Sequence, residues 1–156
     1  MNSNFMHNNF VKLCYMDRSP TFYTSFLFIT NAVVTFYYKY YLYSFVFLLM
    51  TITSIMVHGN YYKQQILWID KVAIILVILT GGYIYCKKIA QHEQKSSSKY
   101  FQSIVIFFSF LFFLFMEFYG SFFGALNYDA NKNIGLTYHA FLHLIGCLGH
   151  LMIVLL

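Results

Sequence analysis

The chain has 156 residues, of which 60% are hydrophobic and 10% are charged, and its formal net charge is +5. Five long stretches contain no Asp, Glu, Lys or Arg, at 19–38, 40–62, 72–86, 100–116 and 133–156. Because a membrane-crossing helix needs about 20 mostly apolar residues, this pattern excludes an ordinary soluble domain and predicts an integral, multi-pass membrane protein. The positive charges form no basic groove interleaved with aromatic residues, which excludes a nucleic-acid partner and leaves the bilayer as the expected one.

The predicted fold class is all-α, a polytopic transmembrane helical bundle of about five spans. A polar N-terminal segment, 1–20, is expected to precede one transmembrane helical domain, 21–156. The spans are expected at about 22–38, 40–58, 66–86, 101–119 and 136–156.

Little more than Lys39 separates the first two spans. A single helix through both would be about 55 Å long at 1.5 Å per residue, so a tight hairpin is expected instead. The tyrosines beside Lys39 are expected at headgroup depth. They are Tyr37, Tyr38, Tyr40, Tyr41 and Tyr43. Farther along, the Lys- and Ser-rich segment from Lys87 to Lys99 predicts a flexible, basic loop.

Polar residues interrupt the apolar chain at Ser54-x-x-x-His58, at Asp70 and at His139-x-x-x-His143. Ionisable groups inside a bilayer cost free energy unless they are paired or functional, so these residues predict a site. The second span ends at His58, the third begins near Asp70, and the fifth begins near the two other histidines. Because the third and fourth spans cross and return, all four ionisable groups are expected at one depth on one side of the membrane.

The histidine spacing predicts a metal. Residues four apart lie on one face of a helix about 6 Å apart, so His139 and His143 can direct ring nitrogens at one ion. Three histidines with a fourth position left for water are a common ligand set of catalytic zinc.

These motifs resemble those of the CREST superfamily of membrane hydrolases, which includes alkaline ceramidases, progestin and adiponectin receptors, GPI-lipid remodelling proteins and myomaker-like proteins. The matching stretches are "SIMVHGNYYKQQILWIDKVAII" and "TYHAFLHLIGCLGHLMIVLL". The resemblance implies a Zn²⁺ held by His58, His139 and His143, with Ser54 and Asp70 beside the water that the zinc activates.

Chemically, the implied activity is ceramidase-like hydrolysis of a lipid amide or ester. Zinc lowers the pKa of its water from about 16 to about 7. Asp70 would accept the water proton and return it to the leaving group, and Ser54 would donate a hydrogen bond to the water or the oxyanion. The expected partner is a membrane lipid, ceramide or a related one. The resembled families have seven spans against the five expected here, so the substrate pocket is either open to lipid or completed by a second copy in a homo-oligomer.

Other interpretations stay open. In place of a catalytic role, Asp70 would pair with Lys63 at the interface, and Ser54 would bond only the carbonyl four residues earlier. His150 is expected to be a hydrogen-bonding residue between helices. Gly146 and Gly149 allow close helix approach. For the whole protein, one alternative is a non-catalytic, zinc-stabilised membrane scaffold or a fusion or assembly protein. The second is an electron carrier with a haem between two histidines.

Overall fold

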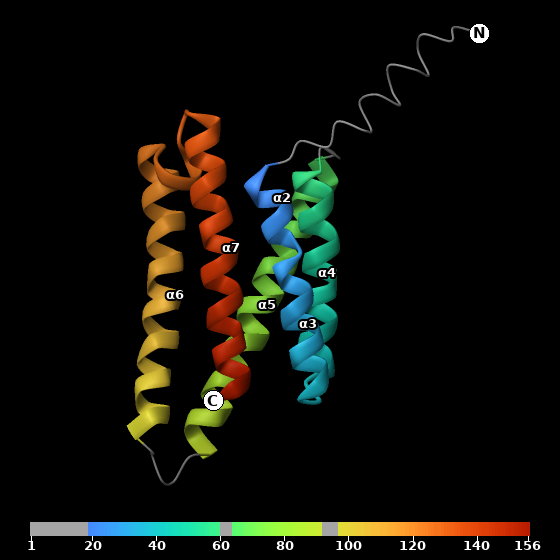
Figure 1. The fold of residues 1–156 in the computed structure, drawn as a ribbon, viewed down its shortest axis with the longest axis vertical. Coiled ribbons are helices and arrows are strands. Elements are labelled where there is room, and N and C mark those ends of the chain that lie inside the picture. The colour runs from blue at the N-terminus through green and yellow to red at the C-terminus, as the bar shows by residue number, and fades with distance from the viewer. Residues whose placement is uncertain (1–18, 60–63, 92–96) are drawn as a thin grey trace, which may run out of the picture.

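The computed structural model describes residues 19–59, 64–91 and 97–156. Its elements in chain order are α2 (Pro20–Ser25), α3 (Leu27–Tyr37), α4 (Tyr41–His58), α5 (Gln64–Gln91), α6 (Ser97–Phe123), the short 3₁₀ helix η1 (Leu126–Tyr128) and α7 (Lys132–Leu155). These three ranges contain no strand, and the helices run side by side as a bundle (Figure 1). The predicted all-α helical bundle is confirmed.

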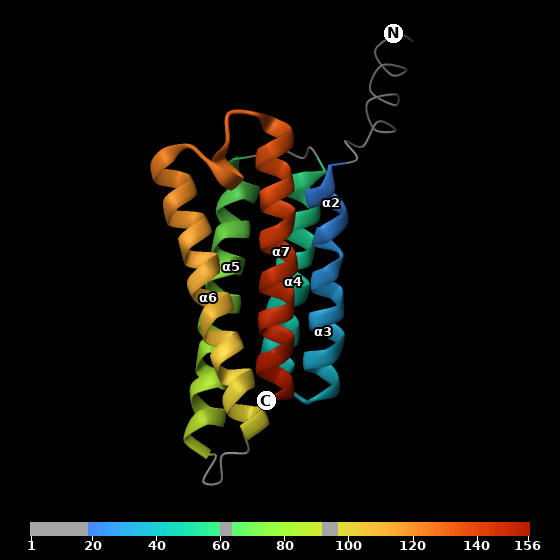
Figure 2. The same cartoon turned by 60° about the vertical axis from the view of Figure 1, so that its left-hand side comes forward.

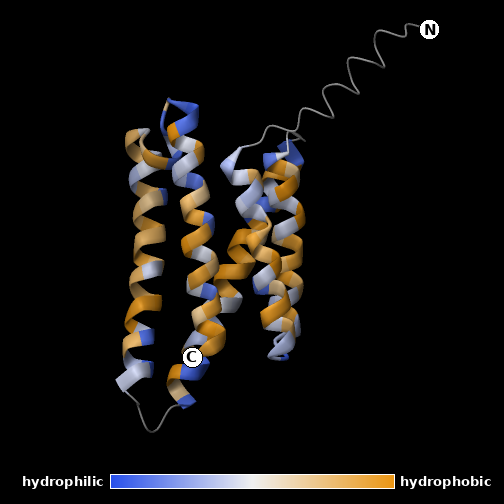
Figure 3. Ribbon diagram, in the orientation of Figure 1, coloured by the Kyte–Doolittle hydropathy of each residue, from blue (hydrophilic) through white to orange (hydrophobic). Residues whose placement is uncertain are grey.

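Four segments are long and apolar enough to cross a membrane: α4, α5, α6 together with η1, and α7. In Figure 3 the apolar residues concentrate in the middle of the bundle and the hydrophilic ones lie mostly toward its two ends. The protein is therefore an integral membrane protein. Helices α5 and α6 extend past both ends of their expected spans, and α7 begins before its expected span. Hydrophilic turns continue these helices beyond the apolar stretches.

The first expected span, 22–38, is not one uninterrupted helix. It consists of α2 and α3, of 6 and 11 residues, which are separated at Phe26. Each is too short to cross the hydrocarbon core alone, although the two follow one another alongside α4 (Figures 1 and 2). The hydroxyl of Ser25 donates to the Thr21 carbonyl at 2.8 Å, and side-chain bonds of this kind bend helices. The sequence prediction counted only apolar length, so it missed this break.

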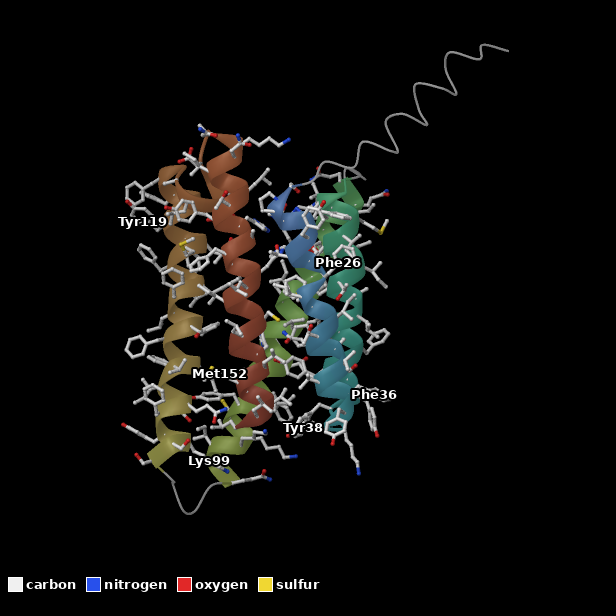
Figure 4. The ribbon with its side chains drawn as sticks, viewed as in Figure 1. Phe26, Phe36, Tyr38, Lys99, Tyr119 and Met152 are labelled. Atoms are coloured by element: carbon white, nitrogen blue, oxygen red, sulfur yellow. The ribbon has the colours of Figure 1, made fainter. Side chains whose placement is uncertain are left out.

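Helices α3 and α4 are joined by the predicted tight hairpin, with Lys39 in the left-handed region at φ 65°. The Lys39 N–H donates to the Phe36 carbonyl and the Tyr40 N–H to the Thr35 carbonyl, both at 2.9 Å. This pair of bonds is a Schellman ending, which satisfies carbonyls that the end of a helix leaves without partners. Figure 4 shows Phe36 and Tyr38 projecting outward beside this turn.

The tyrosines near this turn have two different environments. Tyr37, Tyr38 and Tyr41 are exposed, but Tyr43 is completely buried and its hydroxyl bonds Nδ1 of His150 on α7. Tyr43 therefore faces the interior of the bundle, whereas the other three tyrosines lie on its surface. It belongs to the face of α4 that packs into the bundle, where a buried phenol needs a hydrogen-bond partner.

The basic segment is mostly helical. Lys87 and Lys88 continue α5 and Lys99 lies in α6, so the expected flexible loop is wrong for these residues, and 92–96 lie outside the described ranges. No Pro or Gly interrupts the helix after Tyr85, and the Lys88 ammonium reaches the Val154 carbonyl on α7. Long lysine stems allow this, because they lie along apolar surface while the charged end finds a polar group.

The helices are joined by small and polar buried side chains. The Asn31 side-chain amide donates to the Cys147 carbonyl at 3.2 Å, and the Ser44 hydroxyl donates to the Ala32 carbonyl at 2.7 Å. Such interhelical bonds and close contacts hold membrane helices together, since lipid supplies no hydrophobic drive between them. The backbone of α6 lies close to α7, whereas its recorded link to α5 is a side-chain hydrogen bond from the Tyr85 hydroxyl to the Ser103 carbonyl at 3.3 Å. The side of the bundle between α5 and α6 is therefore loosely closed.

Candidate metal centre and its cavity

Three histidine rings meet at the end of the bundle where α4 ends and α7 begins. His58 is the last residue of α4, and His139 and His143 lie one turn apart on α7. Their ring centroids are 4.8 to 5.3 Å apart, and ligand nitrogens from the three residues all lie within 4.8 Å of one another. The structure thus brings the three predicted ligands together. Zinc–nitrogen bonds of about 2.1 Å can connect such a group after small side-chain rotations.

The ring of His143 is fixed by a residue of α2. Thr24 Oγ1 lies 3.0 Å from Nδ1 of His143, and it also lies 3.1 Å and 3.2 Å from the carbonyls of Pro20 and Thr21. A hydroxyl has one proton, so when Thr24 donates it to a carbonyl, the oxygen accepts Nδ1–H of the imidazole. Nε2 is then the nitrogen with a lone pair. An oxygen partner on the second nitrogen is the usual support of a metal-binding histidine.

Ser54 is buried one turn before His58, and its Oγ lies 2.9 Å from Oγ of Ser25. Ser25 donates its own proton to the Thr21 carbonyl, so Ser54 is the donor in the pair. The alternative bond, from Ser54 to the carbonyl four residues earlier, is not found within the described ranges. Instead its proton points at α2, and its oxygen keeps lone pairs that can accept a hydrogen bond.

Asp70 lies one and a half turns into α5, and its Oδ1 accepts the Thr53 hydroxyl at 2.7 Å. No partner of Oδ2 occurs among the described residues. The alternative partner Lys63 lies outside those residues, and the Lys71 ammonium lies 5.4 Å from the centre of the Trp68 ring. The bond from Thr53 leaves one carboxylate oxygen of Asp70 for the cavity described next.

A cavity of about 380 Å³ runs between α5, α6 and α7, and Ser54, Asp70, His139 and His143 line one end of it. Its wall follows α5 as far as Cys86, about 24 Å from Asp70 at 1.5 Å per residue. The wall between the two ends is mostly apolar. It includes Ile74, Val77, Ile78, Phe110, Ile145 and Ile153. The polar cluster therefore opens into a long apolar space within the bundle.

His150 forms a hydrogen bond between helices, as predicted, and its partner is Tyr43 of α4. A Cβ atom at Gly81 of α5 would lie 2.5 Å from the Tyr43 hydroxyl and 2.7 Å from Nδ1 of His150. Gly81 is thus the residue that lets three helices meet closely. Close approach was instead expected at Gly146 and Gly149; a Cβ at Gly146 would meet nothing within 4 Å. That expectation is wrong for Gly146, which lines the cavity.

Sequence reasoning missed the residues that support the centre, namely Thr24, Ser25 and Thr53. They carry no charge and lie in apolar stretches, where hydroxyl residues commonly bond their own helix. A usable signal was present in the run Thr21 to Ser25, because three of its five residues are Ser or Thr at the start of an otherwise apolar stretch.

Comparison of the chain with protein-family models, curated proteins and solved structures finds no match.

Proposed function

We propose that this protein is a zinc-dependent membrane hydrolase that cleaves an amide or ester bond of a lipid, with ceramide as the first candidate. The observation that carries the proposal is the three-histidine group, of which His139 and His143 line one end of a long apolar cavity inside the bundle. The polar end fits a carbonyl and the apolar part fits a hydrocarbon chain.

The donor set fits zinc. Neutral imidazoles are good zinc ligands, three of them leave a fourth position open, and the Thr24 oxygen fixes the tautomer of His143. His58, His139 and His143 would hold the ion. When bound, zinc would supply hydroxide near neutral pH, because it lowers the pKa of water to about 7.

Asp70 is the proposed proton acceptor. Its Oδ1 is occupied by the Thr53 hydroxyl, which orients the carboxylate and leaves Oδ2 to take a proton from the attacking water. The same oxygen returns the proton to the leaving amine or alcohol, the usual alternation of general base and general acid.

Ser54 has a different role from the one expected. Since its proton is directed to Ser25, its oxygen accepts a hydrogen bond from the attacking water and so orients it. Donation to an oxyanion would require the bond between the two serines to break.

Cavity size limits the substrate. Sites for single small ligands have volumes of about 300 to 1,000 Å³, so 380 Å³ suits one hydrocarbon chain. A second chain would remain in the bilayer, beside the loosely closed side between α5 and α6.

Ring packing counts against the haem alternative. The three imidazoles contact one another edge to face, with centroids at 4.8 to 5.3 Å. A porphyrin between two axial histidines would have to separate rings that now touch, and Asp70 and Ser54 would have no role.

The deciding experiment measures zinc and lipid hydrolysis on the same purified protein. We expect about one zinc per chain and release of fatty acid from ceramide, with both lost in His58→Ala, His139→Ala and His143→Ala. His150→Gln is the matched control, because its amide oxygen can still accept the Tyr43 hydroxyl, and it should keep its zinc. Absence of zinc refutes the metal centre. Zinc without hydrolysis of ceramide, phospholipid or GPI-type ester refutes the enzyme and leaves the zinc-stabilised scaffold.

A further inference from the structure

A second polar position lies deep in the cavity, away from the three-histidine group. His150 and Ser109 both line the cavity wall, on α7 and α6. They lie at the same level, because a Cβ at Gly149 would be 3.6 Å from Cβ of Ser109. His150 follows His143 by seven residues, which is about 10 Å farther along the helix.

The hydrogen bond to Tyr43 determines which ring nitrogen of His150 carries the proton. The hydroxyl of Tyr43, which is completely buried, has Nδ1 of His150 as its recorded partner. If Nδ1 carried the proton, the hydroxyl proton of Tyr43 would have no acceptor, so Nδ1 is the acceptor. The neutral ring then carries its proton on Nε2. No acceptor for this N–H occurs within the described ranges, and the ring lines the cavity.

Ser109 offers the complementary group. Its hydroxyl donates to the Val105 carbonyl at 2.8 Å, which leaves the lone pairs of Oγ as acceptors. At one level of an otherwise apolar wall, the cavity therefore presents one donor and one acceptor. Both groups face the cavity, so a ligand that supplies a hydrogen-bond partner for each is favoured over a purely apolar one.

We infer that the cavity selects a lipid chain bearing a hydroxyl near its middle, bound between His150 and Ser109. The hydroxyl accepts Nε2–H of His150 and donates to Oγ of Ser109. The identity of the cavity as the site of the lipid chain rests on the proposed function. The hydroxyl itself takes no part in hydrolysis, so His150 and Ser109 are specificity-determining residues.

The test compares oleoyl ethanolamide with ricinoleoyl ethanolamide, which differ by one mid-chain hydroxyl. Both compete with a fluorescent fatty amide for the purified full-length protein in detergent micelles, with a chelator present so that binding is measured without turnover. We expect the hydroxylated amide to bind about two- to tenfold more tightly, the effect of a neutral hydrogen bond.

Two variants attribute this preference to the pair. Ser109→Ala keeps Cβ against Gly149 and removes the acceptor, and it should reduce the ratio of the two affinities. The double variant Tyr43→Phe with His150→Phe removes the donor without leaving a buried hydroxyl unpartnered, and it should bring the ratio close to one. Thr137→Val, which removes a hydroxyl that bonds its own helix outside the cavity lining, is the control and should keep the wild-type ratio.

Equal affinities in the wild type, or a preference that survives in both variants, would overturn the inference. The outcome is independent of the enzyme proposal. A preference that depends on His150 and Ser109 in a protein without hydrolytic activity supports the hydroxyl site and removes the proposed function. Hydrolysis of ceramide together with equal affinities supports the proposed function and removes the hydroxyl site.

Discussion

Thr24 Oγ1 lies 3.0 Å from Nδ1 of His143, so a six-residue helix near the start of the described chain orients a ring on its last helix. The two residues are separated by 119 positions in sequence. Neither the threonine nor the helix carries any motif that points to a metal. Their contact gives the first prediction.

Thr24→Val should weaken zinc binding by about 10- to 100-fold, the usual effect of removing an outer partner of a ligating histidine. Valine keeps the branched shape, so the fold should persist. The measurement is zinc retention against a graded chelator. Thr137→Val is the matched control, because the Thr137 hydroxyl bonds only a carbonyl of its own helix. Equal zinc retention in the two variants would contradict the role of Thr24.

Asp70→Asn should keep zinc and fold and lose at least about 100-fold in turnover, because an amide cannot accept the proton. The Thr53 hydroxyl can still donate to the amide oxygen, so stability should change little. Turnover and zinc content are measured on one preparation. Asp129→Asn, at an exposed cap of the segment before α7, should leave both unchanged. Full activity in Asp70→Asn would exclude Asp70 as the proton acceptor.

Gly81→Ala should destabilise the bundle by about 1 to 3 kcal/mol, since the added Cβ would meet the Tyr43 hydroxyl at 2.5 Å. Gly82→Ala is the adjacent control, with nothing within 4 Å of the added atom, and should be neutral or stabilising by up to about 1 kcal/mol. Unfolding in mixed micelles gives both values. If the two substitutions have the same effect, α5 does not cross α4 and α7 at this glycine.

Tyr43→Phe should cost about 1 to 3 kcal/mol of stability by leaving Nδ1 of His150 buried without a partner. His150→Phe alone should cost a similar amount, and the double variant should cost less than the sum. A double-mutant cycle on unfolding free energies measures the difference. Tyr83→Phe, on an exposed face of α5, should have almost no effect. Additive costs would mean that the two residues are not coupled.

Much of the fold could be predicted because charge-free length is a direct signal of membrane helices, and the turn at Lys39 followed from a length argument alone. The break at Phe26 could not, because apolar length does not indicate where a helix is interrupted. The helical start of the basic segment at Lys87 and Lys88 was not predicted either. Lys88 continues α5, and its ammonium reaches a carbonyl on α7, a contact that exists only in the folded bundle.

At the site, the convergence of His58 with His139 and His143 was predictable from spacing and from the number of membrane crossings. The number of membrane crossings predicts that these residues lie at one depth, but it does not predict which neighbours they contact. The Ser54 proton was expected to point into the site and instead points to Ser25. That direction depends on the position of α2, which sequence spacing does not determine.

The three-histidine group can form only after α4 and α7 have come together. His58 lies at the end of α4, and His139 and His143 lie on α7, about eighty residues later in the chain. A nascent or truncated chain that lacks α7 has one ring and Asp70 but no three-ring group. Metal uptake would therefore follow docking of α7, and an ion joining α4 to α7 would close a loop of about eighty residues. By loop-closure entropy such a link disfavours the undocked chain, so metal-depleted cells should accumulate a protein whose α7 is accessible to protease.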